Sequence, residues 1–249
     1  MIAKKIFKEI EKHAPLKLAL EFDTTGFSVG NRDAEIDGVL VAENVTHDVI
    51  NEAKENGCNL IVSHHPAIFG EDIDEFTESI IKHAHDDKIT LYSAHTNLDA
   101  AKGGLNDALA ELLGIEVEDG YNTCARFGHF KDDGLLKDKA KEIGKLLNDT
   151  HIRTIGDKNR VVKTVCVSSG AGARDDELVE EMKRRNIDVL IGGENKLSIA
   201  LKMKYYDICL IEVGHYNSEI LAKDIFEKWL SPLQIKVVKS KKDINPYND

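Results

Sequence analysis

An internal repeat constrains the fold of this chain more than any other feature. Residues 39–65 (VLVAENVTHDVINEAKENGCNLIVSHH) and 165–194 (VCVSSGAGARDDELVEEMKRRNIDVLIGGE) each read as an apolar run, a turn, a helical pattern and a second apolar run. The next apolar runs, which precede His95 and His215, correspond in the same way. Because strands alternate with helices in both copies, the repeat predicts an α/β fold with helices flanking mostly parallel strands.

The repeat divides the chain into a first half over residues 1–124, a second half over 125–240 and a charged tail over 241–249. Hydrophobic periodicity places the elements within each half. Strands are predicted at 38–44, 59–63, 90–94, 126–130, 164–170, 188–194, 208–214 and 234–239. Helices are predicted at 2–13, 75–87, 103–113, 135–147, 175–185, 196–204 and 215–230, with one more between a Thr46 cap and Gly57.

Histidines follow three of the predicted strands. His64 and His65 end the run in IVSHHP, His95 ends the run in LYSAHTNLD, and His215 follows the run in CLIEVGHYNSE. The carboxyl ends of the strands carry the ligand site in open α/β sheets. We therefore expect these histidines at a functional site.

A carboxylate stands four residues after two of these histidines, at Asp99 and Glu219. Imidazole and carboxylate together are usual ligands of divalent Zn, Fe, Mn or Ni. A spacing of four places both side chains on one helix face, which suits Glu219 because a helix is predicted to begin at His215. Asn97 favours a looser turn between His95 and Asp99.

Adjacent His64 and His65 point in different directions from an extended strand, which favours a site with two metal ions about 3.5–4 Å apart. The alternative is that they are ordinary core or surface residues, since a single histidine–carboxylate spacing is a weak signal. Recurrence of the pattern at equivalent strand ends favours the metal site. The other histidines lie in polar or helical contexts and are interpreted as structural or solvated: His13, His47, His83, His85, His129 and His151.

Charge and composition limit the partners. The 33 basic and 44 acidic side chains give a net charge of −11, which does not suit a general polyanion binder. Basic clusters near Lys4, Lys183 and Lys239 are interpreted as solvated surface, although an oligomer could gather them into one basic surface. No apolar run approaches the roughly 20 residues of a membrane-spanning helix, and the N-terminus is not a secretory signal. The four scattered cysteines suit reduced thiols, so a cytoplasmic location is expected.

The glycine-rich loop SSGAGAR (168–174) joins a predicted strand to a helix, where backbone N–H groups can hold an anion. Asp175 stands where a dinucleotide fingerprint has its third glycine. The loop is therefore interpreted as a tight turn, with a phosphate or substrate contact as the alternative.

The motifs SHHP, HTNLDAAKGGLND, SSGAGA, GGE and GHYNSE, in this order, resemble the GTP cyclohydrolase 1 type 2 family, also called the NGG-interacting-factor-three-like family. The resemblance runs from the N-terminal helix to about Leu230. It implies two similar, interlinked α/β domains, a toroidal homohexamer and two divalent metal ions per subunit.

The matched motifs imply a role for each candidate residue. His64 and His65 would each bind one metal ion, and Asp99 would bind the metal held by His65. His215 and Glu219 would complete the site, with Glu219 bridging the two ions. His95 would lie beside the metals, either as a group that supports a ligand or as a catalytic acid–base group.

Three segments depart from the family pattern. EFDTTGFSVG stands where many members have Trp-Asp-Asn-x-Gly, VAENV lacks an aspartate often found there, and GGENKLS lacks histidines that often follow Gly-Glu. These departures leave the implied metal ligands in place but weaken the transfer of a substrate from the family.

Three functions remain open at this point. The ligand set and the resemblance predict a metal-dependent hydrolase of a nucleotide or related heterocycle, with GTP ring opening as the named reaction. The first alternative is a ring-shaped protein that binds single- or double-stranded DNA through its lysine clusters without turnover. The second is a metal storage or delivery protein.

Overall fold

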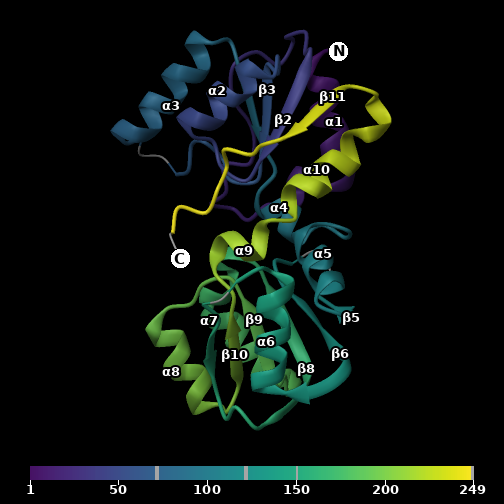
Figure 1. Cartoon of the computed structure of the whole chain (residues 1–249), viewed down its shortest axis with the longest axis vertical. Coiled ribbons are helices and arrows are strands. Elements are labelled where there is room, and N and C mark those ends of the chain that lie inside the picture. The colour runs from purple at the N-terminus through teal and green to yellow at the C-terminus, as the bar shows by residue number, and fades with distance from the viewer. Residues whose placement is uncertain (71–72, 121–122, 150, 248–249) are drawn as a thin grey trace. The chain divides into compact units, whose positions relative to one another are not determined.

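The computed structural model describes residues 1–70, 73–120, 123–149 and 151–247. The chain forms two compact units, one of Met1–Gly104 with Leu221–Asp249 and one of Leu105–Ile220. The second unit is therefore inserted, in sequence, between two segments of the first (Figure 1). The halves predicted from the repeat follow sequence similarity, whereas these units follow packing, and the repeat-based division stays a prediction.

A five-stranded sheet forms the centre of the first unit, in the order β1-β4-β3-β2-β11. Its strands are β1 (Gly26–Val29), β2 (Gly38–Ala42), β3 (Leu60–Ser63), β4 (Thr90–Ser93) and β11 (Lys236–Lys239). The helices of this unit are α1 (Ala3–His13), α2 (His47–Glu55), α3 (Glu75–Asp86), α4 (Thr96–Ala100) and α10 (Ala222–Leu230). The strands pair in parallel except at the β1 edge, which runs antiparallel to β4.

Both faces of this sheet are covered, which explains why its strands are apolar along their whole length. On one face Leu91 belongs to the same core as Val49 of α2 and Ile80 of α3. The next residue, Tyr92, points to the other face because side chains alternate along a strand, and there Phe7 of α1 stacks on it with ring centroids 4.5 Å apart. Figure 1 shows α2 and α3 together on one side of the sheet.

The second unit is built on a six-stranded sheet in the order β5-β6-β8-β9-β10-β7. Its strands are β5 (Ile115–Asp119), β6 (Arg126–Leu135), β7 (Arg153–Ile155), β8 (Val161–Ser168), β9 (Val189–Gly192) and β10 (Cys209–Glu212). Its helices are α5 (Leu105–Leu112), α6 (Leu136–Leu146), α7 (Asp176–Arg185), α8 (Leu197–Tyr205) and α9 (His215–Glu219). Strands β8, β9 and β10 pair in parallel, and the outer pairs are antiparallel.

Helices α7 and α8 are held against this sheet by apolar side chains. Met182 of α7 and Ile199 of α8 share a buried core with Leu190 of β9. Helix α7 is capped at its start by the side chain of Asp175, and after its last residue Arg185 the C-cap residue Asn186 takes the left-handed conformation. The position of α7 on the sheet is therefore set by its capping residues and by the packing of its apolar side chains.

The α/β class with mostly parallel strands is confirmed, and so is the Thr46 cap, whose side chain accepts from the backbone N–H of Val49. The prediction of one helix over 215–230 was wrong. Helix α9 ends at Glu219 and α10 starts at Ala222. The short edge strands β1, β5 and β7 were not predicted, because their partly exposed residues give a weak hydrophobic pattern.

All four cysteines are free thiols, as their spacing predicted. Among the described residues no helix combines the length and the apolar character needed to cross a bilayer.

Candidate metal centre

Two histidines directly follow strand β3 of the first unit. The backbone N–H of His64 donates to the Ala42 oxygen at 3.1 Å, and that of His65 donates to the Glu43 oxygen at 2.8 Å, so both residues are bonded to the chain at the end of β2. His95 stands two residues after the end of β4, and its backbone N–H donates to the side chain of Asn97 at 2.9 Å. The expectation that these histidines stand at the carboxyl ends of parallel strands is therefore confirmed.

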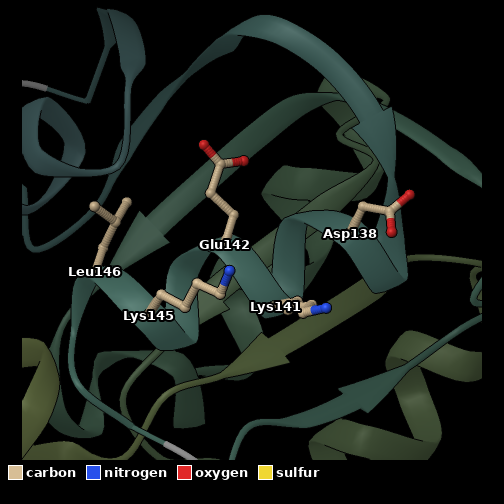
Figure 2. Close-up of a pocket in the computed structure, with 5 residues that line it drawn as sticks. All are labelled: Asp138, Lys141, Glu142, Lys145 and Leu146. Atoms are coloured by element: carbon tan, nitrogen blue, oxygen red, sulfur yellow. The ribbon is translucent and has the colours of Figure 1, made fainter.

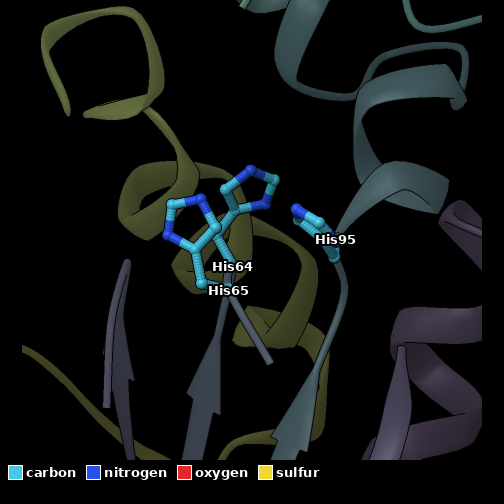
Figure 3. A group of neighbouring side chains, drawn as sticks. All are labelled: His64, His65 and His95. Carbon is cyan, nitrogen blue, oxygen red and sulfur yellow. The ribbon is translucent and has the colours of Figure 1, made fainter. Parts of the chain in front are cut away.

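The three imidazoles form a cluster within the first unit (Figure 3). Ring centroids are 4.8 Å apart for His64 and His65, 5.2 Å for His64 and His95, and 5.4 Å for His65 and His95. One nitrogen from each ring lies within 4.8 Å of the others, a separation at which they could hold a metal ion. His64 is fully buried, whereas the other two rings are half-buried.

Each of the three rings is held at Nδ1 by an oxygen acceptor. The acceptors are the backbone oxygen of Ala94 for His64 at 3.0 Å, Oδ1 of Asn44 for His65 at 2.9 Å and Oδ1 of Asp23 for His95 at 2.9 Å. A carbonyl or carboxylate oxygen only accepts, so the proton lies on Nδ1 and a neutral ring keeps a lone pair on Nε2. Histidines that ligate metals are usually oriented in this manner.

Asp23 ties the His95 ring to helix α4. Its second oxygen, Oδ2, accepts from the backbone N–H of Thr96 at 3.0 Å and also from the Thr96 hydroxyl. Burial acts to raise the pKa of Asp23, but the hydrogen bonds from His95 and Thr96 outweigh it and lower the pKa below its ordinary value. The group facing Nδ1 of His95 is therefore a carboxylate.

Helix α4 brings Asp99 to the histidines. Its Oδ1 lies 3.7 Å from Nε2 of His64. The looser turn suggested by Asn97 is a regular start of the helix, because the Asn97 side chain accepts from the backbone N–H of His95 at 2.9 Å. The resemblance assigned Asp99 to the metal of His65, and that assignment stays a prediction.

The second unit carries the other histidine–carboxylate pair. Helix α9 begins at His215 directly after Gly214, whose φ is +78°. Nε2 of His215 lies 3.2 Å from Oε2 of the buried Glu219, which confirms that the spacing of four places both on one helix face. On the other side of the ring, Nδ1 of His215 lies 3.6 Å from a carboxylate oxygen of Glu194.

The glycine-rich loop packs directly against this pair. Gly170 has a φ of +53°, and a Cβ on it would lie 2.0 Å from Oε1 of Glu219 and 3.0 Å from Nε2 of His215. The Gly170 N–H donates to the hydroxyl of Ser218 at 2.9 Å. The tight turn predicted here is thus required by close approach to His215 and Glu219.

The second unit has glycine where the first has its buried histidine. Gly193 corresponds to His64 in the repeat, and a Cβ on Gly193 would lie 2.5 Å from the Gly170 oxygen and 2.6 Å from the Ser218 hydroxyl. No larger side chain fits there without moving the loop. The two copies of the repeat therefore place different residues at this position.

Several neighbours of these groups were missed from the sequence. Asp23 lies in EFDTTG, which signalled only a departure from a family pattern, and it meets His95 across 72 residues. The contacts of Asn44 and Glu194 likewise left no local signal, because their partners His65 and His215 come from elements farther along the chain. The aromatic and acidic partners of the remaining histidines fit the structural interpretation, as where His13 stacks on Trp229 with centroids 4.8 Å apart.

A cavity of about 540 Å³ opens beside His65 within the first unit. Its lining includes Phe69 and Phe76, both more than half exposed, and the C-terminal segment around Asp243. A second hollow of about 360 Å³ lies on the exposed side of α6 in the other unit and is lined by one helix alone (Figure 2). The described residues that line this second hollow include no histidine, so the first cavity is the one that accompanies the histidine cluster.

The donor set fits a borderline divalent metal ion. Imidazole nitrogens with carboxylate oxygens suit Zn, Fe, Mn or Ni, and the described part of each unit offers both types close together.

The sequence and the fold have known relatives over nearly the whole chain. Residues 1–246 match the sequence model of the Duf34/NIF3 (NGG1p interacting factor 3) family. A Clostridium perfringens protein named GTP cyclohydrolase 1 type 2 homolog is 33% identical over 256 residues, covering 96% of this chain and 96% of the relative. A Methanocaldococcus jannaschii protein of the same name is 32% identical over 239 residues, covering 93% and 95%.

Solved structures share the fold. A hypothetical protein of Staphylococcus aureus superposes with a TM-score of 0.89 at 24% identity, over 100% of this chain and 99% of the other. Reduced HcgD from Methanocaldococcus jannaschii superposes with a TM-score of 0.81 at 29% identity, over 97% and 98%.

Proposed function

Because this chain belongs to the Duf34/NIF3 (NGG1p interacting factor 3) family, we propose that it binds two divalent metal ions per subunit and uses them to hydrolyse a nucleotide or a related heterocycle. The named reaction to test first is ring opening of GTP, since several relatives carry the name GTP cyclohydrolase 1 type 2 homolog.

The observation that carries the proposal is the histidine cluster of the first unit. All three rings give Nδ1 to an oxygen acceptor, which leaves the Nε2 lone pairs for a metal ion or a proton. Core packing alone does not explain why three histidine rings lie so close together, because two of the rings are only half-buried and so are not core residues.

We assign the metal ligands to both units. In the first unit they are His64, His65 and Asp99, and in the second they are His215 and Glu219. The short His64–Asp99 and His215–Glu219 separations, 3.7 Å and 3.2 Å, support this assignment because each pair mixes a nitrogen with a carboxylate donor. The metal is Zn, Fe, Mn or Ni, and cellular supply selects among them.

When bound, the metal ions supply Lewis acidity, which polarises a substrate oxygen and makes water more acidic. His95 is assigned the proton transfer. Asp23 holds its Nδ1–H and fixes the direction of the ring, so Nε2 is the atom that takes a proton from water and returns it to the leaving group. The Asp23 carboxylate stabilises the imidazolium that forms in between.

The cavity beside His65 supports a substrate with a flat ring. Phe69 and Phe76 line it and offer aromatic faces on which a heterocycle can stack. Its volume of about 540 Å³ lies in the range usual for small-molecule sites.

DNA binding is the weaker alternative, because several side chains of the basic clusters are already paired with carboxylates. Lys239 lies 2.8 Å from Asp224 and 3.1 Å from Glu227, and Arg185 bonds to Glu181. A metal-delivery protein would bind the same metal ions but would show no substrate turnover. We further propose that the protein is cytoplasmic and assembles as a toroidal homohexamer. Light scattering of the purified protein would test the number of subunits.

The test is turnover of GTP and a panel of other nucleotides by protein loaded separately with Zn, Fe, Mn or Ni. We expect product with at least one metal, and its loss in His65→Ala. The matched control is His85→Ala, since the His85 side chain is 81% exposed and lies next to Asp86 on α3. Absence of any turnover that His65→Ala removes would contradict the proposal and favour metal delivery.

A further inference from the structure

The C-terminal segment that follows β11 is fastened to the first unit by buried polar groups. The hydroxyl of Ser240 donates to Glu52 at 2.6 Å, and the backbone N–H of Lys241 donates to the same carboxylate at 2.9 Å. The side chains of Ser240, Asp243 and Glu52 are all nearly inaccessible to solvent. This segment, expected as a charged tail, therefore has a fixed course over residues 240–243.

Asp243 directs its carboxylate at the end of strand β2. Its Oδ2 accepts from the backbone N–H of Glu43, and its Oδ1 accepts from the Asn44 amide at 3.1 Å. The ammonium of Lys223 lies 3.7 Å from Oδ2 and balances the charge. Asp243 is thus held from two sides while it contacts Asn44.

Asn44 connects this carboxylate to the histidine cluster. Its nitrogen Nδ2 faces Asp243, and its oxygen Oδ1 faces Nδ1 of His65 at 2.9 Å. An asparagine amide has a donor end and an acceptor end, and either end could face His65 if nothing fixed the choice. The neighbour that fixes the choice is Asp243, because a carboxylate can only accept.

The hydrogen bonds that link Asp243, Asn44 and His65 can run in one direction only. The carboxylate of Asp243 requires the NH₂ end of Asn44, so the carbonyl end turns to His65. That carbonyl requires a proton on Nδ1 of His65, which leaves the lone pair on Nε2. If Asn44 turned around, its NH₂ would donate to Nδ1, the ring proton would move to Nε2, and Nε2 would be closed to a metal ion.

We propose that Asp243 is a positioning residue that sets the tautomer of His65 through the Asn44 amide, and so opens Nε2 of His65 to a metal ion. The tautomer follows from the hydrogen bonds alone, whereas the effect on metal affinity rests on the proposed function. A residue of the C-terminal segment thereby orients His65, which follows β3 in the first third of the sequence.

The test variant reverses the direction of these hydrogen bonds and keeps the size and shape of the side chain at position 243. In Asp243→Asn the new amide keeps its oxygen toward the Glu43 N–H and presents NH₂ to Asn44. Asn44 must then turn its oxygen to residue 243 and its NH₂ to His65. We expect the Nε2–H tautomer of His65 in ¹⁵N–¹H correlation spectra of the metal-free full chain, and a loss of Zn²⁺ affinity of about 10–100-fold by chelator competition.

The exchanged pair Asn44→Asp/Asp243→Asn should restore both readouts, because the carboxylate introduced at position 44 accepts from the new amide and from Nδ1–H of His65 alike. A merely structural role of the segment would not be restored in this way. The matched control is Asp224→Ala, which removes an aspartate of the same unit whose partner is Lys239; it should leave both readouts unchanged.

Retention of the Nδ1–H tautomer in Asp243→Asn would overturn the proposal, as would equal losses in the single variant and the exchanged pair. A tautomer that inverts and is restored in a protein that binds no metal would uphold the role of Asp243 and refute the proposed function, so the two failures are distinguishable.

Discussion

The carboxylate of Asp23 accepts the Nδ1 hydrogen of His95 at 2.9 Å, although the two residues are 72 positions apart in the chain. This contact decides which nitrogen of His95 carries the proton, because a carboxylate oxygen only accepts. It also separates the proposed role of His95 in proton transfer from the role of the metal ligands, because Asp23 touches His95 and Thr96 and bonds to no proposed ligand among the contacts described above.

Replacing Asp23 should therefore impair turnover without removing metal. We expect Asp23→Asn to lower kcat by about 10–100-fold, because the amide no longer holds His95 as an oriented, charge-stabilised base. Metal content and KM should stay close to wild type. Steady-state kinetics together with elemental analysis check this, with Asp33→Asn as control, since Asp33 is exposed and pairs only with Lys4 among the ion pairs described. Loss of metal in Asp23→Asn would contradict the separation of roles.

The close approach of the glycine-rich loop gives a second prediction. Gly170→Ala places a Cβ against Glu219 and His215 and also strains a backbone with φ of +53°. Gly57→Ala strains a similar backbone, with φ of +62°, but meets nothing within 4 Å. Backbone strain should cost each variant about 1–2 kcal/mol of unfolding free energy. Gly170→Ala should lose more than Gly57→Ala because of its close contacts, and only Gly170→Ala should also lose bound metal. Equal metal content in the two variants would show that the loop does not constrain this pair.

A third prediction concerns the pH dependence of stability. Burial acts to raise the pKa of Glu52, but hydrogen bonds from Ser240 and the backbone of Lys241 and Lys242 lower it below the ordinary 4.5. A lowered folded-state pKa stabilises the protein above pH 4.5, and this contribution is lost as pH falls through the folded-state pKa.

Glu52→Gln should therefore be less stable than wild type near neutral pH, and the difference should shrink as the pH falls below 4.5. Urea denaturation at a series of pH values measures it, with Glu55→Gln as the control because Glu55 is exposed at the end of the same helix. A difference that grows on acidification would show that the Glu52 contacts do not anchor the C-terminal segment.

The thiols give a fourth prediction. Cys58, Cys166 and Cys209 are buried, and burial raises the pKa of each of them, so the reactive thiolate is suppressed. Cys124 is the partly exposed thiol of the four. Native protein should react quickly with a thiol reagent at Cys124 and slowly at the others, and all four should react after unfolding. Fast reaction of Cys166 in native protein would contradict its burial.

The sequence predicted those parts of the site that depend on local pattern. His64 and His65 end an apolar run before Pro66, and the spacing of His215 and Glu219 follows the helix period, so both were found without tertiary information. The α/β class followed from alternating strands and helices for the same reason.

The remainder depends on contacts between distant segments. Asp23 reaches His95, and Asn44 reaches Asp243 across 199 residues, so neither pair leaves a pattern within a sequence window. The break between α9 and α10 also escaped prediction. Apolar residues continue through Ile220 and Leu221, so periodicity alone suggested one helix where the structure has two.

Binding of two divalent metal ions per subunit is the proposed property on which the proposed function depends. Its most direct measurement is elemental analysis of protein purified without chelators and then equilibrated with excess metal and desalted, for wild type and for His64→Ala, His65→Ala and Glu219→Ala. We expect two ions per wild-type subunit and at most one in each variant. Wild type without stoichiometric metal, or variants that all retain two ions, would contradict it.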